Sequence, residues 1–341
     1  MFEPIFPACF VELPFSYTNK RAAFYLALEE HIASSFPANN YLFTWQIQPT
    51  VVLGRNQNAS TEVDLEFCKS NGIDVIRRKS GGGCIYADMG NIMVSIITRQ
   101  GAVQPLFKEY AHAIGAYLQS LGANIEVSGR NDILLSGKGK ICGNAFYHMK
   151  DRNIIHGTML YDTNFSLMKG SLTPDKEKLS SKGVKSVNSR ISLLKDELDT
   201  IQIDVLRNGI RQHLTNSSIR LSEEDLQNVK AIEADYYDPL YIFGRKSDTE
   251  INTSCSARIE GCGTIKVRFI LNDEQINAVE LSGDFFENGN AAEVFNKAFY
   301  LCPYNLESME NVVRNHHLEE VIHGLEQTEL LYLIKSIFQQ F

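Results

Sequence analysis

Two stretches in the N-terminal half of the chain have the apolar spacing of amphipathic helices. Residues 20–34 place small and apolar side chains at helical spacing after Asn19, a candidate N-cap, with Glu29 and Glu30 on another face. Residues 107–121 carry a continuous apolar stripe and are followed by a glycine, the residue type that favours helix ends. The pattern therefore predicts one helix at each of these places.

Short apolar runs bounded by Gly, Pro, Asn or Asp indicate strands. Four such runs lie between the two helices, and four more follow the second helix, joined by short polar turns. Short turns favour antiparallel pairing over helical crossovers, so we expect an α+β fold with a mixed, largely antiparallel sheet flanked by helices. The predicted strands are residues 41–45, 51–53, 75–76, 92–98, 124–127, 133–135, 139–146 and 154–161.

The C-terminal part has a different pattern. A helical stretch at residues 193–214 ends in a polar segment, and Ser222 with Asp225 three residues later resembles a capping box that opens another helix. Residues 264–281 alternate in polarity on both sides of Asn-Asp-Glu, which predicts a hairpin. The tail at residues 319–341 has the pattern of an amphipathic helix.

The length of the chain adds a domain division. With 341 residues and 44% hydrophobic composition, the chain is long enough for two domains of ordinary size. We expect a larger domain at residues 1–218 and a small α+β domain at residues 219–341.

The formal net charge of -8 argues against a surface that coats nucleic acid, because phosphate binding needs basic residues. Any anion site must therefore be local.

The N-terminus and the cysteines bear on the compartment. No basic segment precedes an apolar core, and no Arg- and Ser-rich pattern is present, so neither a signal peptide nor a transit peptide is expected. No apolar run approaches the roughly 20 residues that span a bilayer. The seven cysteines are scattered and never spaced C-x-x-C, which favours reduced thiols. We expect a cytoplasmic protein without a membrane partner, and a monomer, because no exposed apolar helix face stands out.

The segment at residues 77–91 has the composition of an anion site. It begins Arg-Arg-Lys-Ser-Gly-Gly-Gly, so three cations lead, after one serine, into three glycines. Glycine lets backbone N–H groups approach an anion closely, and the basic side chains supply charge. The alternative is a glycine turn preceded by solvated basic residues. Because the chain has no G-x-x-x-x-G-K-[ST] or G-x-G-x-x-G motif, this segment alone leaves both interpretations open.

Three further segments follow this one in order. They are Gly-Arg-Asn-Asp at residues 129–132, Lys-Ile-Cys-Gly-Asn-Ala at residues 140–145 and His-Gly-Thr at residues 156–158. The set resembles the lipoate-protein ligase family, whose catalytic domain carries R-R-x-S-G-G-G-x-V-x-H-D-x-G-N, G-R-N-D, K-[IV]-x-G-[NS]-A and H-G-T. Gly-Asp-Phe-Phe at residues 283–286 resembles the hairpin end of the family's accessory domain.

The resemblance implies a biotin/lipoate ligase-like fold, related to class II synthetases, and a reaction in two steps. The carboxylate of (R)-lipoate attacks the α-phosphate of ATP, with Mg²⁺ present, and a carrier lysine then attacks the lipoyl-AMP. The implied carriers are lipoyl domains of the glycine cleavage H protein and of 2-oxoacid dehydrogenase E2 subunits. Lys140 is implied as the catalytic residue, because its ammonium could neutralise the carboxylate and the α-phosphate together.

The other matching residues are implied to bind ATP and lipoyl-AMP. Arg78 would hold phosphate through its planar donor fork, and Asp132 could hold Mg²⁺ or form an Asx turn. His156 could line the acyl tunnel, orient the adenylate or be a buried structural histidine. The complete implied binding set is Arg78, Ser80, Gly82, Gly83, Cys84, Ile85, Tyr86, Asn91, Asn131, Asp132, Lys140 and His156.

A basic segment at residues 169–190 predicts a long loop. Lys182 and Lys185 could close over the adenylate as a lid and exclude water, although a solvated loop has the same composition. A lipoyl domain would then present its lysine to a basic rim formed by Lys150, Arg152 and this loop.

The chain departs from the family pattern at Ala87, where the family often has His.

An octanoyltransferase shares the catalytic fold and carries the acyl group on a cysteine thiolate. Cys142 is a candidate for this thiolate because Lys140 is near, and the other interpretation of Cys142 is a small core residue. The serine-glycine segment and the accessory domain resemble the ligase instead. A biotin ligase and a non-catalytic lipoyl-domain binder are the further alternatives.

Overall fold

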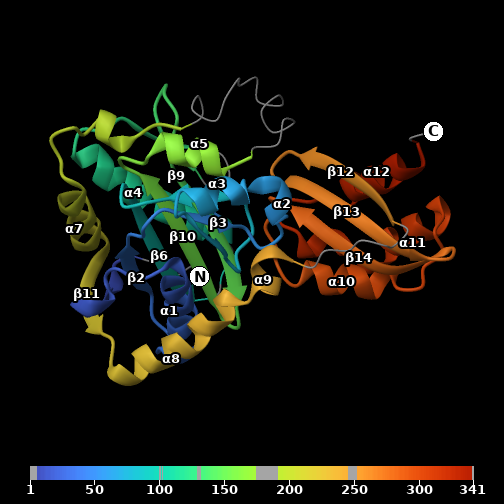
Figure 1. Cartoon of the computed structure of the whole chain (residues 1–341), viewed down its shortest axis with the longest axis horizontal. Coiled ribbons are helices and arrows are strands. Elements are labelled where there is room, and N and C mark those ends of the chain that lie inside the picture. The colour runs from blue at the N-terminus through green and yellow to red at the C-terminus, as the bar shows by residue number, and fades with distance from the viewer. Residues whose placement is uncertain are drawn as a thin grey trace. The chain divides into compact units, whose positions relative to one another are not determined.

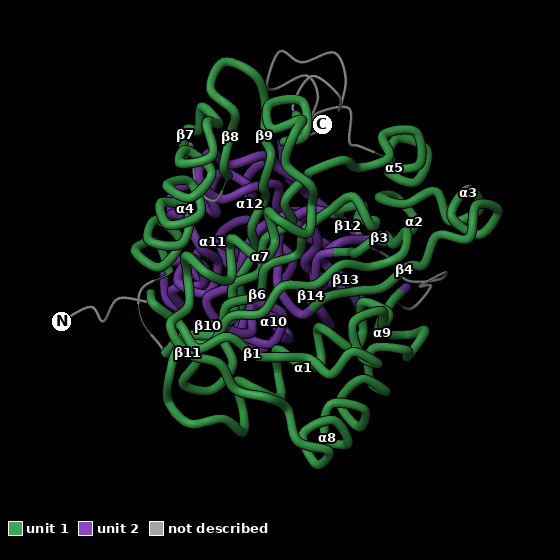
Figure 2. The backbone as a smooth tube through the Cα atoms, turned by 90° about the vertical axis from the view of Figure 1, so that its left-hand side faces the viewer, with its two compact units in different colours: residues 1–53, 59–78, 84–242 green, residues 54–58, 79–83, 243–341 purple. Residues whose placement is uncertain are grey.

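The computed structural model describes residues 6–99, 101, 103–128, 132–173, 191–244 and 252–339. Contacts divide the chain into two compact units (Figure 2). Each unit contains its own hydrophobic core. Unit 1 comprises residues 1–53, 59–78 and 84–242, and unit 2 comprises residues 54–58, 79–83 and 243–341. The two short insertions mean that chain segments far apart in sequence complete unit 2.

An eight-stranded sheet forms the centre of unit 1, in the order β11-β1-β2-β6-β10-β9-β8-β7 (Figure 1). β1 is parallel to both β11 and β2, and the other pairs are antiparallel. This confirms the expected α+β fold with a mixed, largely antiparallel sheet. The strands are β1 (Ala8–Glu12), β2 (Tyr41–Trp45), β6 (Asn91–Arg99), β7 (Ile125–Ser128), β8 (Asp132–Leu135), β9 (Lys140–Met149), β10 (Arg152–Leu160) and β11 (Thr215–Arg220).

A second sheet of unit 1 has three strands, with β3 (Thr50–Leu53) parallel to β4 (Asp74–Arg77) and antiparallel to β5 (Ile85–Ala87). Helix α1 packs with side chains of one face of the large sheet, and α4 lies on the other, where the Phe107 and Phe146 rings are 5.5 Å apart. The α-helices described in this unit are α1 (Ala22–Ser35), α2 (Ala59–Glu62), α3 (Leu65–Ser70), α4 (Val103–Ser120), α5 (Phe165–Ser171), α7 (Ile203–Leu214), α8 (Glu223–Glu233) and α9 (Pro239–Phe243).

Helix α1 differs from the predicted amphipathic helix. Every residue from 22 to 33 is buried, including Glu29 at 0% and Glu30 at 4% exposure, and the residue at the N-cap is Arg21, not Asn19. The expected separate polar face is therefore wrong. Buried carboxylates need partners, and the hydroxyl of Tyr236 donates to Glu30 Oε1 at 2.5 Å.

The region after residue 190 also differs from the sequence pattern. The helix expected at residues 193–214 is a 3-10 turn (Leu194–Asp196) followed by α7, because a turn at residues 199–200, where Asp and Thr stand, separates them. The polar segment after α7 is the strand β11, which pairs with β1. Strands β1, β5 and β11 were not expected, because their short sequences become strands through pairing with neighbours.

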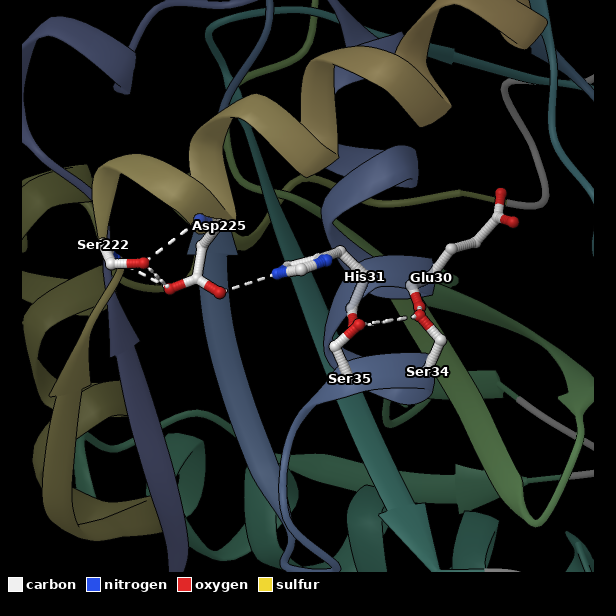
Figure 3. Close-up of polar contacts among 6 residues, drawn as sticks. All are labelled: Glu30, His31, Ser34, Ser35, Ser222 and Asp225. Carbon is white, nitrogen blue, oxygen red and sulfur yellow. Dashed lines mark hydrogen bonds and ion pairs between the residues drawn. The ribbon is translucent and has the colours of Figure 1, made fainter.

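Helix α8 belongs to unit 1, beyond the boundary expected after residue 218. The capping box is confirmed: the Asp225 N–H donates to Ser222 Oγ, and the Ser222 N–H donates to Asp225 Oδ2. Asp225 Oδ1 also lies 2.8 Å from Nε2 of the buried His31 in α1 (Figure 3). The Ser222 hydroxyl bonds the carboxylate and not the imidazole, so the three groups do not form a nucleophile relay. They hold α8 on α1.

Unit 2 contains a three-stranded antiparallel sheet of β12 (Asn252–Ile259), β13 (Gly263–Asn272) and β14 (Gln275–Gly283). The predicted β13–β14 hairpin is confirmed, and Asp273 takes a φ of 53° in its turn. The sheet packs with α10 (Ala291–Phe299), α11 (Leu306–His316) and α12 (Gln327–Phe338). The tail helix is shorter than predicted, because Gly324 with a φ of 74° interrupts it. Within the described residues, no helix combines the length and apolarity needed to cross a membrane.

The Asp225 contact can be tested by removing its charge. Burial alone would raise the pKa of Asp225, but hydrogen bonds from Ser222 and His31 outweigh burial and leave the pKa below its ordinary value. A carboxylate with a lowered pKa stabilises the fold above its unfolded-state pKa of about 4, and this contribution is lost as the pH falls through the folded-state pKa. We expect Asp225→Asn to lower the free energy of unfolding by about 1 kcal/mol at pH 7.

Urea unfolding at pH 7 and pH 3 measures this, and the loss should shrink at pH 3. Glu224→Gln removes an exposed acid from the same first turn and is the matched control. If Asp225→Asn lowered the free energy of unfolding equally at both pH values, the charge of Asp225 would not contribute to stability.

Candidate functional site

Lys140 begins β9, and its ammonium extends along the strand. Its Nζ lies 3.4 Å from Asp132 Oδ1, and the two side chains are 36% and 30% exposed. Asp132 pairs with Gly143 across β8 and β9, and a Cβ at Gly143 would stand 3.2 Å from the Lys140 Nζ. Glycine at position 143 therefore leaves room for the ammonium, which is a physical reason for the Lys-x-x-Gly spacing.

The chain on either side of residues 174–190 is anchored within unit 1. The Ser192 N–H donates to the Lys140 carbonyl at 2.9 Å. At the other end, the Thr173 N–H donates to the Glu62 carbonyl at 3.0 Å, and its hydroxyl donates to the Thr61 carbonyl at 2.7 Å. Lys182 and Lys185 lie outside the described residues, so the lid stays a prediction, although the chain that leaves that segment joins the backbone of Lys140.

A chain of buried polar groups connects α1 to the large sheet. Nδ1 of His156 lies 3.0 Å from Glu29 Oε2, and the Ser95 hydroxyl donates to Glu29 Oε1 at 2.5 Å. The Trp45 Nε1–H donates to Ser95 Oγ at 2.8 Å. His156 and Ser95 are paired across β10 and β6, so both side chains are on the face that α1 covers. The Glu29 carboxylate therefore fixes the orientation of the His156 ring.

Glu29, Ser95 and Trp45 were missed by sequence reasoning, because none of them lies in a recognisable motif. A single signal was present. Glu29 stands in an otherwise apolar helical stretch, where a carboxylate is costly unless it is paired.

Arg78 follows β4 and is 4% exposed. Its backbone N–H donates to the Leu53 carbonyl and its Nη1 to the Val52 carbonyl, both at 3.0 Å. Burial lowers the pKa of Arg78 to about 10, against smaller raising effects of Cys84, Tyr241 and Glu29.

Residues 79–83 are part of unit 2. Ser80 is fully buried, and its carbonyl accepts the Arg55 N–H at 2.9 Å. The Gly82 N–H donates to the Phe285 carbonyl at 3.1 Å, and a Cβ at Gly81 would stand 2.3 Å from the same oxygen. The close backbone approach therefore requires glycine at position 81. This contact also engages one of the N–H groups that the anion-site hypothesis uses.

The residues after the glycines alternate in direction along β5. Ile85 and Ala87 pack with the core that includes α1, whereas Tyr86 packs with a separate cluster that includes Val51 and Met168. Half-buried Cys84 precedes the strand. Ile85 therefore fits the apolar wall that the sequence implied, and Ala87 leaves a small side chain on the same side. The Tyr86 ring does not contribute to that wall.

Asn91 is fully buried at the start of β6. Its Oδ1 accepts the Asp88 N–H at 2.8 Å, while its Nδ2 has no hydrogen-bond partner among the described residues. A buried amide donor without a partner is uncommon and fits a group that meets a ligand. Asn131, in contrast, lies outside the described residues, so its implied role stays a prediction.

The structure contradicts Arg152 as a member of the expected basic rim, whereas Lys150 is exposed and its part in the rim stays a prediction. Lys150 follows the last residue of β9, a ten-residue strand, and so stands roughly 30 Å from Lys140 at its start. Arg152 is 3% exposed. Its guanidinium donates to the carbonyls of Phe36, Pro37 and Asn39, so it caps the end of α1 and is not available to a partner.

Cys142 does not have the surroundings of a nucleophile. Its side chain is fully buried on the α4 face, and Sγ lies 3.6 Å from Asn144 Oδ1. A Cβ at Gly157 would meet both Cys142 Sγ and the hydroxyl of Tyr110. Burial raises the pKa of the thiol to about 12. Because the thiolate is the reactive form, this geometry argues against an octanoyltransferase that uses Cys142 and supports the core interpretation.

Known proteins match both parts of the chain. Residues 21–215 match the lipoyl protein ligase A/B catalytic domain, and residues 248–334 match the bacterial lipoate protein ligase C-terminus. The chain is 31% identical to lipoate-protein ligase 1 of Staphylococcus aureus over 91% of this chain and 95% of the relative. It is 32% identical to a lipoate-protein ligase of Bacillus subtilis over 80% of this chain and 84% of the relative.

Solved structures share the fold. LipL1 of P. falciparum in complex with lipoate has a TM-score of 0.78 at 18% identity and covers 98% of this chain and 100% of its own. A bi-partite lipoate protein ligase of Thermoplasma acidophilum, studied with its E2 lipoyl domain, has a TM-score of 0.62 at 25% identity, with 72% and 100% covered. Lipoate-protein ligase A bound with ATP has a TM-score of 0.60 at 24% identity, with 70% and 98% covered.

The catalytic-domain match covers more than half of the chain, and the bacterial relatives exceed 30% identity over most of both sequences. The chain is therefore an enzyme of the lipoate-protein ligase family.

Proposed function

We propose that the chain converts lipoate and ATP into lipoyl-AMP and transfers the lipoyl group to a lysine of a carrier domain. In the first step, a carboxylate oxygen of lipoate attacks the α-phosphorus, and pyrophosphate leaves. In the second, the carrier's lysine nitrogen attacks the acyl carbon, AMP leaves and the nitrogen loses a proton. The observation that carries this proposal is the half-exposed Lys140 ammonium at the start of β9, above the space that Gly143 leaves.

Lys140 would bind the lipoate carboxylate and the α-phosphate at once. Bringing two anions together costs electrostatic energy, and a shared cation lowers that cost in the transition state. Asp132 now holds the ammonium at 3.4 Å. The incoming anions would replace this contact, which keeps Lys140 oriented in their absence.

Asp132 also fits a Mg²⁺ ion that is held mainly by the phosphates and water. Such an ion needs one or two protein carboxylates, and Asp132 is 30% exposed. Among the described residues, no group of three or more His, Cys, Asp or Glu side chains could form a closed metal cage. When bound, the ion would neutralise phosphate charge. Freed from Lys140, the Asp132 carboxylate would supply one oxygen ligand.

Arg78 would hold nucleotide phosphate, with Cys84, Ile85 and the Tyr86 backbone beside the adenylate and Asn91 Nδ2 donating to adenine. Support comes from the buried guanidinium, the apolar side of β5 and the unpartnered Asn91 amide. A likeness to an ATP-bound ligase agrees with this assignment. Ser80, Gly82 and Gly83 would contribute as the family motif implies, and a phosphate at the Gly82 N–H would have to replace the Phe285 carbonyl.

His156 lies on the face of the large sheet that α1 covers. Its cross-strand neighbours on the same sheet face include the buried Phe43, and Met93 and Trp45 are in the next row. These residues belong to the core that α1 covers, and the polar ring is already held by Glu29. A ring fixed in this way favours an orienting or structural role for His156 over direct contact with the phosphate.

The carrier would be a lipoyl domain of an H protein or of an E2 subunit, as the archaeal ligase studied with an E2 lipoyl domain suggests. We also propose a cytoplasmic location. All seven cysteines are free thiols, which fits a reducing compartment.

Replacing Lys140 tests the adenylation step. We expect Lys140→Ala to lower lipoate-dependent exchange of labelled pyrophosphate into ATP by roughly 100- to 1,000-fold, because the shared cation is lost. Lys138→Ala is the matched control, since Lys138 lies two residues away and pairs with Glu197. It should keep exchange within about twofold of the wild type.

Exchange by the wild type that Lys140→Ala retains would remove Lys140 from the mechanism. Wild-type protein that shows no exchange, but forms an acyl adduct with octanoyl carrier protein, would overturn the ligase proposal.

The Cys142 thiol can be tested by alkylation. We expect iodoacetamide at pH 8 to modify half-buried Cys84 well before Cys142 in the folded protein, because Cys142 is fully buried and its pKa is raised to about 12. Peptide mass spectrometry over a time course measures both sites, and urea-unfolded protein should lose the difference. Faster labelling of Cys142 in the native protein would show that this thiol is reactive.

A further inference from the structure

Arg77 ends β4, and its side chain leaves the strand in the direction opposite to that of Arg78. It is 6% exposed. Its Nε donates to the carbonyls of Tyr241 and Ile242 at 2.8 and 3.0 Å, and its Nη2 donates to the Ile242 carbonyl at 2.7 Å. These carbonyls belong to the last turn of α9, where helix carbonyls have no partner within the helix. Arg77 therefore joins the end of β4 to the end of α9.

The same strand is fixed at its other end. Arg21, which precedes α1, donates to both oxygens of Asp74 at 2.8 and 2.7 Å, and Asp74 is the first residue of β4. Its guanidinium also lies 4.5 Å from the centre of the Tyr237 ring, next to α9. β4 is thus held by a cation at each end, and it delivers Arg78 directly after its last residue.

The two neighbouring arginines consequently have different tasks. The Arg78 guanidinium donates to the Val52 carbonyl of the neighbouring strand β3, while that of Arg77 donates to the carbonyls of α9. A planar donor fork can serve two carbonyls at once, which the single ammonium of lysine cannot do with the same geometry. The contact therefore requires arginine specifically, beyond the need for a positive charge.

We infer that Arg77 is a positioning residue for adenylation: by fixing the end of β4 on α9, it holds the Arg78 guanidinium in the place where ATP phosphate binds. This rests on the proposed phosphate role of Arg78. A phosphate-binding group must be placed closely, because a displacement of about 1 Å can cost a rate factor of roughly 100. Loss of the Arg77 contact releases the strand end at the residue before Arg78.

Unit 1 contains a matched control for a merely structural arginine. Arg152 is equally buried, at 3% exposure, and its guanidinium also donates to three backbone carbonyls at the end of a helix, those of residues 36, 37 and 39. It begins β10 opposite Met149, the last residue of β9, and so lies far from Lys140. Arg77→Lys and Arg152→Lys thus remove the same kind of contact at different distances from the site.

The experiment measures the KM for ATP and the KM for lipoate in pyrophosphate exchange, together with thermal unfolding. We expect Arg77→Lys to raise the KM for ATP by roughly tenfold, with the KM for lipoate within about twofold of the wild type. Arg152→Lys should lower the unfolding temperature and leave both KM values unchanged. Arg78→Gln provides a background in which adding Arg77→Lys should have no further effect on the KM for ATP, because the two positions act through one group.

Two results would overturn the inference. In the first, Arg77→Lys changes only the fraction of folded enzyme, as Arg152→Lys does. In the second, Arg77→Lys raises the KM for ATP by the same factor in the Arg78→Gln background as in the wild type.

Native-state hydrogen exchange decides the same question without an activity measurement. The Arg78 amide, which donates to Leu53, should exchange roughly tenfold faster in Arg77→Lys and at the wild-type rate in Arg152→Lys. Absence of pyrophosphate exchange in the wild-type protein would contradict the proposed function. The exchange rate of the Arg78 amide would still test whether Arg77 fixes the position of Arg78.

Discussion

The buried carboxylate of Glu29 is the interaction on which the candidate site depends. It stands at 0% exposure in α1 and is stabilised by the Ser95 hydroxyl and the His156 ring, which the sheet presents from adjacent strands. An unpaired charge at this depth would be very costly, so the docking of α1 on the sheet has to bring these partners to Glu29. Arg78 is held separately, by its hydrogen bonds to the Leu53 and Val52 carbonyls of β3.

The two faces of the large sheet consequently have different roles. The face that α1 covers carries His156, which contacts Glu29 of that helix, and the Lys140 ammonium reaches the space that Gly143 leaves beside Asp132. The α4 face carries Cys142, closed in by Tyr110 and Asn144. Two residues apart in sequence, Lys140 and Cys142 therefore differ in chemistry, because one ammonium is half-exposed and one thiol is sealed. This difference separates a ligase that relies on a cation from a transferase that relies on a thiolate.

Arginine is used in this fold as a connector as well as a charge. Arg77, Arg152 and Arg21 each reach carbonyl or carboxylate oxygens at the end of a helix or strand. A guanidinium can satisfy several such oxygens in a buried setting, where an unpaired carbonyl is costly. The positions of α1, β4 and α9 in unit 1 are joined in this way, and Arg78 lies among them. A motif of adjacent basic residues can thus combine a ligand contact with a structural one.

The sequence by itself determined the strands β2, β6 and β10, the hairpin of unit 2 and the capping box at Ser222, because local periodicity and turn chemistry encode them. The order of the motifs also identified the family and marked Arg78, Asp132, Lys140 and His156 as candidate site residues. The tertiary structure alone decided that Glu29 is buried, that Arg152 is a cap and not a rim, that Cys142 is sealed, and that residues 215–220 are a strand beside β1. These are properties of pairing and burial between distant segments, and no local pattern carries them.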